Sequence, residues 1–129
     1  MNTLNDLSET ILRFGVGTRA SLATVHNGTG YFAVTPQAPY DPGLGTAEQA
    51  AQLLAKAEAR LSEIGSGKDK LLFVAIMLAD MADYAEMNAV WDEWVADIKP
   101  PARACLNAAL ATPALKIEMI IVCAVPQAV

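Results

Sequence analysis

Two charged residues lie inside apolar segments near the end of the 129-residue chain, and they are the first candidates for chemistry. Arg103 stands in Pro-Pro-Ala-Arg-Ala-Cys-Leu, and Glu118 stands in Leu-Lys-Ile-Glu-Met-Ile-Ile. A charge within an apolar strand must be paired or must hold a ligand, because an unpaired buried charge is costly. An arginine fork can hold a carboxylate, and a glutamate can activate a water. The competing interpretation is structural: the two side chains pair with each other or lie on a solvated sheet face.

Side-chain alternation along strands relates these residues to their neighbours. Arg103 and Cys105 share one face of their predicted strand, and Glu118 shares a face with the alternate residues between 116 and 122. If the two strands pair as a hairpin in the obvious register, the two faces coincide. A slip of one residue would separate them.

Asparagine, cysteine and histidine are the other residue types that could take part in chemistry. Asn88 lies within an expected helix, where asparagine is unfavourable, so it either binds something specific or faces solvent. Cys105 has no evident base beside it, which favours a buried small hydrophobe over a nucleophile. One histidine, His26, and two unclustered cysteines cannot supply a usual set of metal ligands, so we expect no metal and no cofactor.

Composition argues against several classes of partner. The net charge is −5 and the sequence pI is about 4.7, which does not suit nucleic acid, because phosphate binding needs a basic patch. The apolar runs at 71–79 and 119–125 are too short to cross a bilayer, so we expect no membrane partner. Residues 1–10 are polar, form a short leading segment and do not resemble a secretory signal. Unpaired cysteines and this N-terminus predict a cytoplasmic protein.

The first part of the chain predicts strands, a loop and a helix. Strands are expected at 11–14, 21–26 and 31–35, with Asn27-Gly28 as a two-residue hairpin turn. The proline- and glycine-rich segment 36–45 is a loop. Thr46 and Gln49 form a capping box at the start of a helix that runs to Ile64. Gly65 ends this helix, and its apolar stripe follows helical spacing: Leu53, Leu54, Ala57, Leu61 and Ile64.

The second part predicts a buried strand, a helix and two more strands. Residues 71–79 are continuously apolar, which is typical of a central strand covered on both faces. Asp80 or Asp83 caps a helix that runs to about Val95. Its buried face is expected to hold Tyr84, Met87, Trp91 and Trp94. Strands at 102–110 and 115–124 complete the chain. The order predicts one α+β domain over residues 1–129, a mixed sheet with two helices packed on one face.

At these residues the chain resembles a known family, the RidA (reactive intermediate/imine deaminase, YjgF-like) family. The resemblance covers the C-terminal two thirds well and is weaker before Thr46. It rests on a set of segments at characteristic separations: Arg60-Leu-Ser-Glu-Ile-Gly65, Leu78-Ala-Asp-Met81, Asp83-Tyr-Ala-Glu-Met-Asn88, Trp91, Pro101-Ala-Arg103-Ala-Cys105 and Lys116-Ile-Glu118.

The resemblance implies a chorismate-mutase-like subunit and a homotrimer with clefts between subunits. It implies hydrolysis of 2-imino and 2-enamino acids to 2-oxo acids and ammonia, with neither metal nor organic cofactor. Carried over by motif, Arg103 holds the substrate carboxylate and Glu118 attends the attacking water. The backbone of Cys105 lines the cleft, and Asn88 lies near it.

The N-terminal part departs from the family pattern. The region of a Gly-Pro-Tyr segment reads Gly15-Val-Gly-Thr-Arg-Ala-Ser21 here, so its tyrosine is missing, and the region of a Ser-Gly-Gln segment reads Thr35-Pro-Gln37. Thr35 keeps a hydroxyl at the expected substrate site, and Arg19 is an added cation near it. These differences indicate a divergent subgroup.

Three functions therefore stay open at the level of sequence. The first is the imine deaminase. The second is a non-enzymatic trimer that binds a small carboxylated metabolite through Arg103. The third is an interaction or chaperone-like protein that uses the 53 % apolar content. The family has also been associated with RNA cleavage, which the acidic charge balance disfavours.

Overall fold

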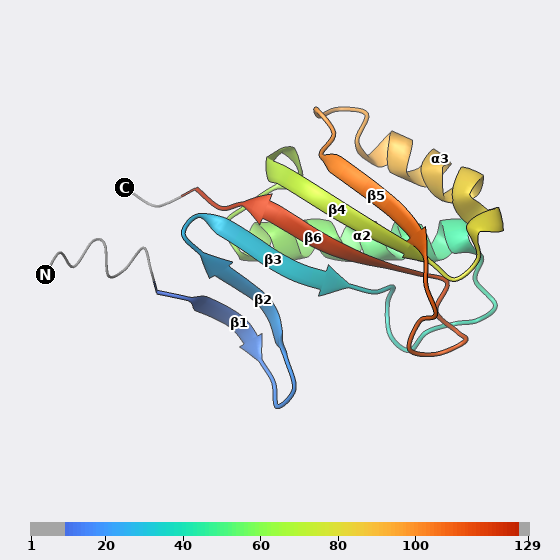
Figure 1. Cartoon of the computed structure of the whole chain (residues 1–129), viewed down its shortest axis with the longest axis horizontal. Coiled ribbons are helices and arrows are strands. Elements are labelled where there is room, and N and C mark those ends of the chain that lie inside the picture. Colours follow the sequence, from blue (N-terminus) through green and yellow to red (C-terminus); the bar gives the residue numbers. More distant parts are fainter. Residues whose placement is uncertain (1–9, 127–129) are drawn as a thin grey trace, which may run out of the picture.

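A computed structural model describes residues 10–126 as a six-stranded mixed sheet carrying two helices, the chorismate-mutase-like α+β arrangement (Figure 1). The sheet order is β1-β2-β3-β6-β4-β5, and only β4 and β5 run parallel. The strands are β1 (Leu12–Val16), β2 (Ser21–His26), β3 (Thr29–Val34), β4 (Leu71–Leu78), β5 (Ala102–Asn107) and β6 (Ile117–Ala124). The helical elements are α2 (Thr46–Glu63), α3 (Tyr84–Trp94) and the 3₁₀ turns η1 (Lys68–Lys70) and η2 (Met81–Asp83). The leading segment predicted at 1–10 lies outside the described residues, except for Thr10.

The N-terminal meander follows its turn residues. Asn27 and Gly28 both have positive φ, 50° and 78°, and join His26 to Thr29 as the predicted two-residue hairpin turn. β3 therefore begins at Thr29, two residues earlier than predicted. β1 continues to Val16 rather than ending at Phe14, because Gly15 adopts a φ of 58° within the strand instead of breaking it.

The predicted hairpin between the last two strands is wrong. β4 lies between β5 and β6, parallel to β5 and antiparallel to β6. The chain reaches β5 from β4 through α3, and such a crossover permits a parallel pair. Both strands are also shorter than predicted, because 108–116 forms a turn segment rather than strand.

The start of α2 differs from the predicted capping box. Gly45 takes the N-cap position, and its backbone N–H donates to Glu48 Oε1 at 3.2 Å. Glycine has no side chain to return the bond, so half of a capping box forms. Thr46 instead donates to Asp83 Oδ2 at 2.6 Å, which ties α2 to the start of α3, and Gln49 is committed elsewhere.

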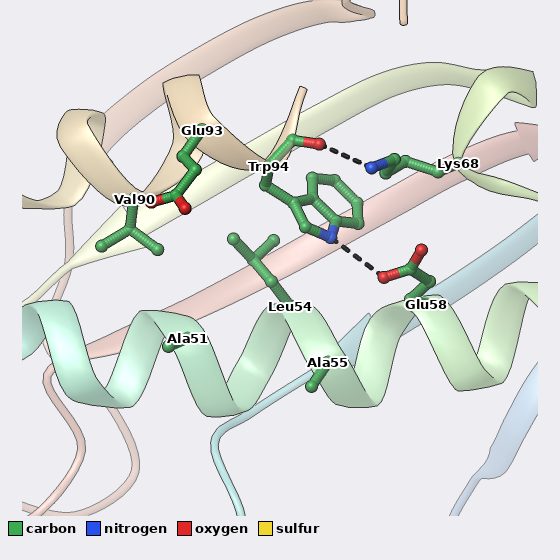
Figure 2. Close-up of a pocket in the computed structure, with 8 residues that line it drawn as sticks. All are labelled: Ala51, Leu54, Ala55, Glu58, Lys68, Val90, Glu93 and Trp94. Carbon is green, nitrogen blue, oxygen red and sulfur yellow. Dashed lines mark hydrogen bonds between the residues drawn. The ribbon is translucent and has the colours of Figure 1, made fainter. Parts of the chain in front are cut away.

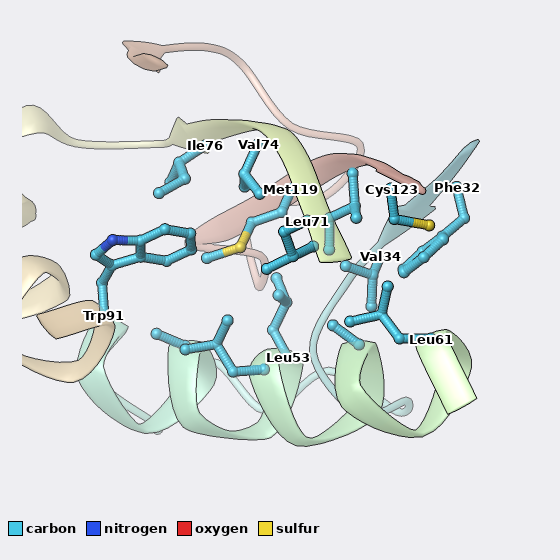
Figure 3. Close-up of a cluster of buried hydrophobic side chains, with 14 of the residues drawn as sticks. Phe32, Val34, Leu53, Leu61, Leu71, Val74, Ile76, Trp91, Met119 and Cys123 are labelled. Carbon is cyan, nitrogen blue, oxygen red and sulfur yellow. The ribbon is translucent and has the colours of Figure 1, made fainter. Parts of the chain in front are cut away.

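The apolar stripe of α2 is confirmed and forms the centre of the core (Figure 3). Each of the five predicted positions is at most 4 % exposed. They pack against alternate residues of the sheet: Phe32, Val34, Val74, Ile76, Leu78, Ile117, Met119 and Ile121. The stripe ends where predicted, since Gly65 has a φ of 82° and Ser66 N–H donates back to the Leu61 carbonyl.

α3 begins at Tyr84, with Asp83 at the N-cap position and Asp80 capping η2 through Ala82 N–H. Its predicted buried face is partly right. Met87 and Trp91 are buried, whereas Tyr84 is 40 % exposed and Trp94 is half-buried.

The other face of the sheet is apolar but uncovered, which corrects the expectation that β4 is covered on both sides. α2 and α3 pack on one face only, and on β4 Leu72 and Phe73 remain 48 % and 38 % exposed. We call this uncovered surface the open face. Its exposed apolar side chains on the four neighbouring strands β3, β6, β4 and β5 are Tyr31, Ile120, Leu72, Phe73 and Leu106.

Between residues 10 and 126 no helix combines the length and the hydropathy that a membrane crossing requires.

Replacing Leu61 with Ala should lower the free energy of unfolding by about 2–5 kcal/mol, because Leu61 is fully buried and its removal leaves a cavity. Chemical denaturation measures this difference. Glu63→Ala is the control on the same helix: Glu63 is exposed, and its replacement removes only a 3.7 Å ion pair with Arg60, which contributes about 1 kcal/mol or less. Equal effects for the two variants would mean that the stripe does not form the core.

Candidate functional site

Arg103 lies on the edge strand β5 and projects toward α3. It pairs in register with Val74, which is fully buried on the helix-covered face. Its Nη1 donates to Asn88 Oδ1 at 2.7 Å, and its Nη2 donates to the Tyr84 hydroxyl at 3.1 Å. Asn88 and Tyr84 are four residues apart on α3, so both reach the same guanidinium. The side chain is thus held in one orientation by two bonds from a neighbouring helix.

Aromatic rings border the same guanidinium. The Cζ atom of Arg103 lies 5.5 Å from the centroid of the Trp91 ring and 5.9 Å from that of Tyr84. These distances permit cation–π attraction, which restrains the group further. Arginine has five N–H donors, and the two bonds to Asn88 and Tyr84 leave three for a ligand. Arg103 is half-buried, so a bound carboxylate would be partly shielded from water.

Cys105 stands two residues along β5 on the same face as Arg103 and pairs with Ile76. Burial raises the pKa of its thiol above the ordinary range, and the nearby positive charge of Arg103 only partly opposes this effect. A raised pKa keeps the thiol protonated near neutral pH. Cys105 is therefore suited to line a site rather than to act as a nucleophile.

Glu118 does not join Arg103 within one chain, contrary to the predicted coincidence of faces. It pairs with Met77, while its neighbours Ile117 and Met119 point into the core. The carboxylate therefore lies on the open face, on the opposite side of the sheet from Arg103. β4 also lies between β5 and β6, so these two strands do not pair with each other and have no hairpin register.

Thr35 lies on the same side as Glu118. It follows Val34, which pairs with Met119, so continuation of the register sets Thr35 opposite Glu118. Its Oγ1 is 3.0 Å from the Tyr40 hydroxyl, which forms a small polar cluster at this end of the open face. β3 is three strand spacings from β5, roughly 14 Å, so Thr35 also lies apart from Arg103 of its own chain.

Gln49 fixes the loop and turn that flank this cluster. Its buried amide donates to the carbonyls of Ala114 and Asp41 and accepts from Lys116 N–H at 2.9 Å. The Lys116 ammonium in turn donates to the carbonyls of Pro42 and Leu44. The loop that carries Tyr40 and the segment leading to Glu118 are therefore held together.

Arg19 is not brought near Arg103 by the fold of one chain. It lies exposed in the turn between β1 and β2, and β1 forms the edge of the sheet opposite β5. Five strand spacings amount to roughly 24 Å. Among residues 10–126, no cluster of three His, Cys, Asp or Glu side chains could hold a metal ion.

Sequence reasoning missed three residues of this arrangement. The apolar pattern of the helix predicts Tyr84 in the core, although its spacing of four from Asn88 is a usable signal of a shared site. Tyr40 lies in a loop whose path no local pattern fixes. The capping-box pattern predicts Gln49 at the helix cap, although its position beside the buried stripe of α2 is consistent with a buried amide.

Comparison with known proteins gives consistent results. The model of a family described as Endoribonuclease L-PSP matches residues 20–125. A RutC family protein of Haemophilus ducreyi is 39 % identical over 115 residues, which cover 89 % of this chain and 97 % of that one. The RutC family protein YoaB of Escherichia coli is 38 % identical over 116 residues, covering 90 % of this chain and 99 % of that one.

Solved structures share the fold. A member of the YjgF protein family from Neisseria meningitidis superposes with a TM-score of 0.84 at 40 % identity, covering 94 % of this chain and 99 % of that one. Yeast Mmf1 superposes with a TM-score of 0.80 at 26 % identity, covering 91 % and 100 %.

Alkylation of Cys105 by iodoacetamide should be slow at neutral pH and should accelerate as the pH rises, because the thiolate is the reacting form and its pKa is raised. Arg103→Gln removes the charge that lowers this pKa, so the rate profile should move to higher pH. Mass spectrometry of the labelled peptides measures both profiles. Cys123 is fully buried and serves as the unreactive internal control. A profile that stays in place or moves to lower pH in Arg103→Gln would contradict the proximity of the two groups.

Proposed function

The chain belongs to the Endoribonuclease L-PSP family and is a RidA-like member with RutC and YjgF relatives, and from this premise we propose that it hydrolyses 2-imino and 2-enamino acids to 2-oxo acids and ammonia. We also propose that residues 1–129 form one domain. The free thiols of Cys105 and Cys123 support a reducing, cytoplasmic location. The net charge of −5 gives no support to an RNA substrate.

The observation that carries the proposal is the oriented guanidinium of Arg103. Bonds to Asn88 and Tyr84 and the adjacent Trp91 ring fix it before any ligand arrives. A fixed fork binds a planar carboxylate through paired charge-assisted hydrogen bonds. Because the reaction is chemically easy, holding the carboxylate in place supplies a large part of the catalysis.

The rest of the site is proposed to come from a second copy. Arg103 and Glu118 lie on opposite faces of the sheet, so one chain cannot direct both at one small molecule. The open face carries Glu118 and is apolar, which suits burial against another subunit. If the β5 edge of one copy meets the open face of the next, the contact is head-to-tail, and we propose that its rotation closes a ring of three copies. A homotrimer then holds three inter-subunit clefts.

In such a cleft the reaction divides between the two copies. Arg103 holds the substrate carboxylate, and the Cys105 backbone lines the wall. Glu118 of the neighbouring copy accepts a proton from a water as its oxygen attacks the imine carbon, which forms a carbinolamine. The same proton is returned to the nitrogen to complete the neutral carbinolamine. Glu118 then transfers the hydroxyl proton of the carbinolamine to the nitrogen, and the C–N bond breaks to release ammonia and the 2-oxo acid. Thr35 and Arg19 are the remaining candidates for contacts with the substrate.

A second function, a trimer that binds a carboxylated metabolite without turnover, is favoured by one specific feature. The Arg103 cradle is complete within a single chain, whereas Glu118 is not part of it. In this case the protein would bind 2-oxo acids through Arg103, and Glu118 would be dispensable.

Arg103→Ala should nearly abolish hydrolysis of freshly generated 2-imino acids, because it removes a charge-assisted contact that contributes about 1.5–3 kcal/mol and the orientation that follows from it. Loss of the imine is followed directly by its absorbance. Arg103→Lys should restore little, since an ammonium does not reproduce the fork. Arg13→Ala, which removes an exposed arginine from β1, is the control and should keep full activity. If Arg103→Ala hydrolysed 2-imino acids at the wild-type rate, the assignment of Arg103 as the carboxylate-binding residue would be wrong.

Glu118→Gln should lower kcat while leaving the affinity for a 2-oxo acid nearly unchanged, because the glutamate is proposed to act on water rather than on the carboxylate. Steady-state kinetics and calorimetry separate the two quantities. If the wild-type protein were inactive but still bound 2-oxo acids through Arg103, the binding function would replace the enzymatic function as the proposal.

The protein should sediment as a homotrimer, because the open face exposes apolar area that assembly would bury. Sedimentation velocity at micromolar concentration measures the mass. A stable monomer would contradict both the assembly and a site shared between copies.

A further inference from the structure

A groove of about 420 Å³ lies between α2 and α3 and is separate from the Arg103 site (Figure 2). The two helices leave it open because α2 contributes the short side chains of Ala51 and Ala55 there. Leu54 and Val90 add apolar surface from the two helices. A volume of this size falls in the range of sites for small organic molecules.

Trp94 forms a rigid aromatic wall at one end of the groove. Its Nε1 donates to Glu58 Oε2 at 3.3 Å, and its carbonyl accepts from the Lys68 ammonium at 2.8 Å. The same ammonium lies 5.4 Å from the ring centroid. The indole is therefore oriented before a ligand binds, which lowers the entropic cost of binding.

The charge at the groove is negative. Glu58 and Glu93 place two carboxylates on its walls, and among residues 10–126 neither of them forms an ion pair. Lys68 is the one cation of the lining, and Asp97 lies 2.9 Å from its ammonium. The hydrogen bond from Lys68 also holds the pKa of Asp97 below its usual range, so this pair contributes no net charge near neutral pH.

We propose that this groove is a binding site for a small organic ammonium ion with a hydrocarbon body. The ammonium lies beside the carboxylates of Glu58 and Glu93, and the hydrocarbon packs on the alanine floor and on Trp94. A carboxylate ligand is disfavoured by the same two glutamates. The site takes no part in the proposed hydrolysis, and its ligand differs in charge from the substrate of that reaction.

Intrinsic fluorescence tests this site, because the chain has two tryptophans, Trp91 and Trp94, with ring centroids 5.7 Å apart. Hexylammonium chloride is titrated at constant ionic strength, with 1-hexanol and sodium hexanoate as neutral and anionic counterparts. A saturable change is expected for hexylammonium, a weaker response for hexanol and none for hexanoate. Equal binding of hexanoate, equal binding of hexanol, or no saturation would overturn the proposal.

Substitutions locate the response. Glu93→Gln should weaken hexylammonium binding about two- to fivefold, the effect of losing one exposed ion pair. Asp92→Asn removes a neighbouring charge on α3 that does not line the groove, and it should change nothing. Circular dichroism checks that both variants are folded. Arg103→Ala should keep the wild-type affinity for hexylammonium even where imine hydrolysis is lost. Loss of hexylammonium binding in Arg103→Ala would overturn the assignment to the groove. Equal losses of affinity in Glu93→Gln and Asp92→Asn would also overturn it.

Discussion

The strand β4 imposes the constraint on which the rest of the structure depends, because it is apolar on both faces and the chain covers only one of them. Val74, Ile76 and Leu78 are fully buried beneath the helices, while Leu72 and Phe73 remain exposed on the open face. Each exposed Å² of apolar surface forgoes about 25 cal/mol of stabilisation. The same face continues across the neighbouring strands, so assembly with another copy is the simplest way to cover it.

The position of β4 also divides the functional groups. It separates β5 from β6, and strand alternation then sends Arg103 and Glu118 to opposite faces. Each side is prepared independently: α3 orients the guanidinium through Asn88 and Tyr84, while Gln49 holds the segments beside Glu118. A cleft between two copies needs one part of the site on each of two different faces of the subunit, and Arg103 and Glu118 meet this requirement. The groove beside Trp94 lies outside both halves.

Local patterns predicted the elements well and their pairing less well. The stripe from Leu53 to Ile64 and the Asn27-Gly28 turn were predictable, because helical spacing and positive φ depend on nearby residues only. The pairing of β5 could not be predicted, since alternation in an apolar strand is consistent with either neighbour. The fold class could be predicted because the order of strands and helices along the chain restricts how they can be arranged in layers.

The candidate site was predicted in its residue types but not in its geometry. Arg103 and Glu118 were recognisable as charges in apolar strands, yet their relative position depends on the long-range insertion of β4. Tyr84 and Tyr40 became visible only when tertiary contacts placed their hydroxyls against Arg103 and Thr35. Side chains that act through contacts between distant segments leave little trace in local spacing.

Subunit mixing tests most directly whether the site is shared between copies. Arg103→Ala and Glu118→Gln chains, carrying different tags, are refolded separately and together, and mixed trimers are purified through both tags. Each variant alone should be nearly inactive, whereas each purified mixed trimer should regain about one third of its sites, because one of its three head-to-tail contacts joins an intact Arg103 to an intact Glu118. If mixed assemblies form and recover no activity, the two residues do not serve one site across the interface, and the account is contradicted.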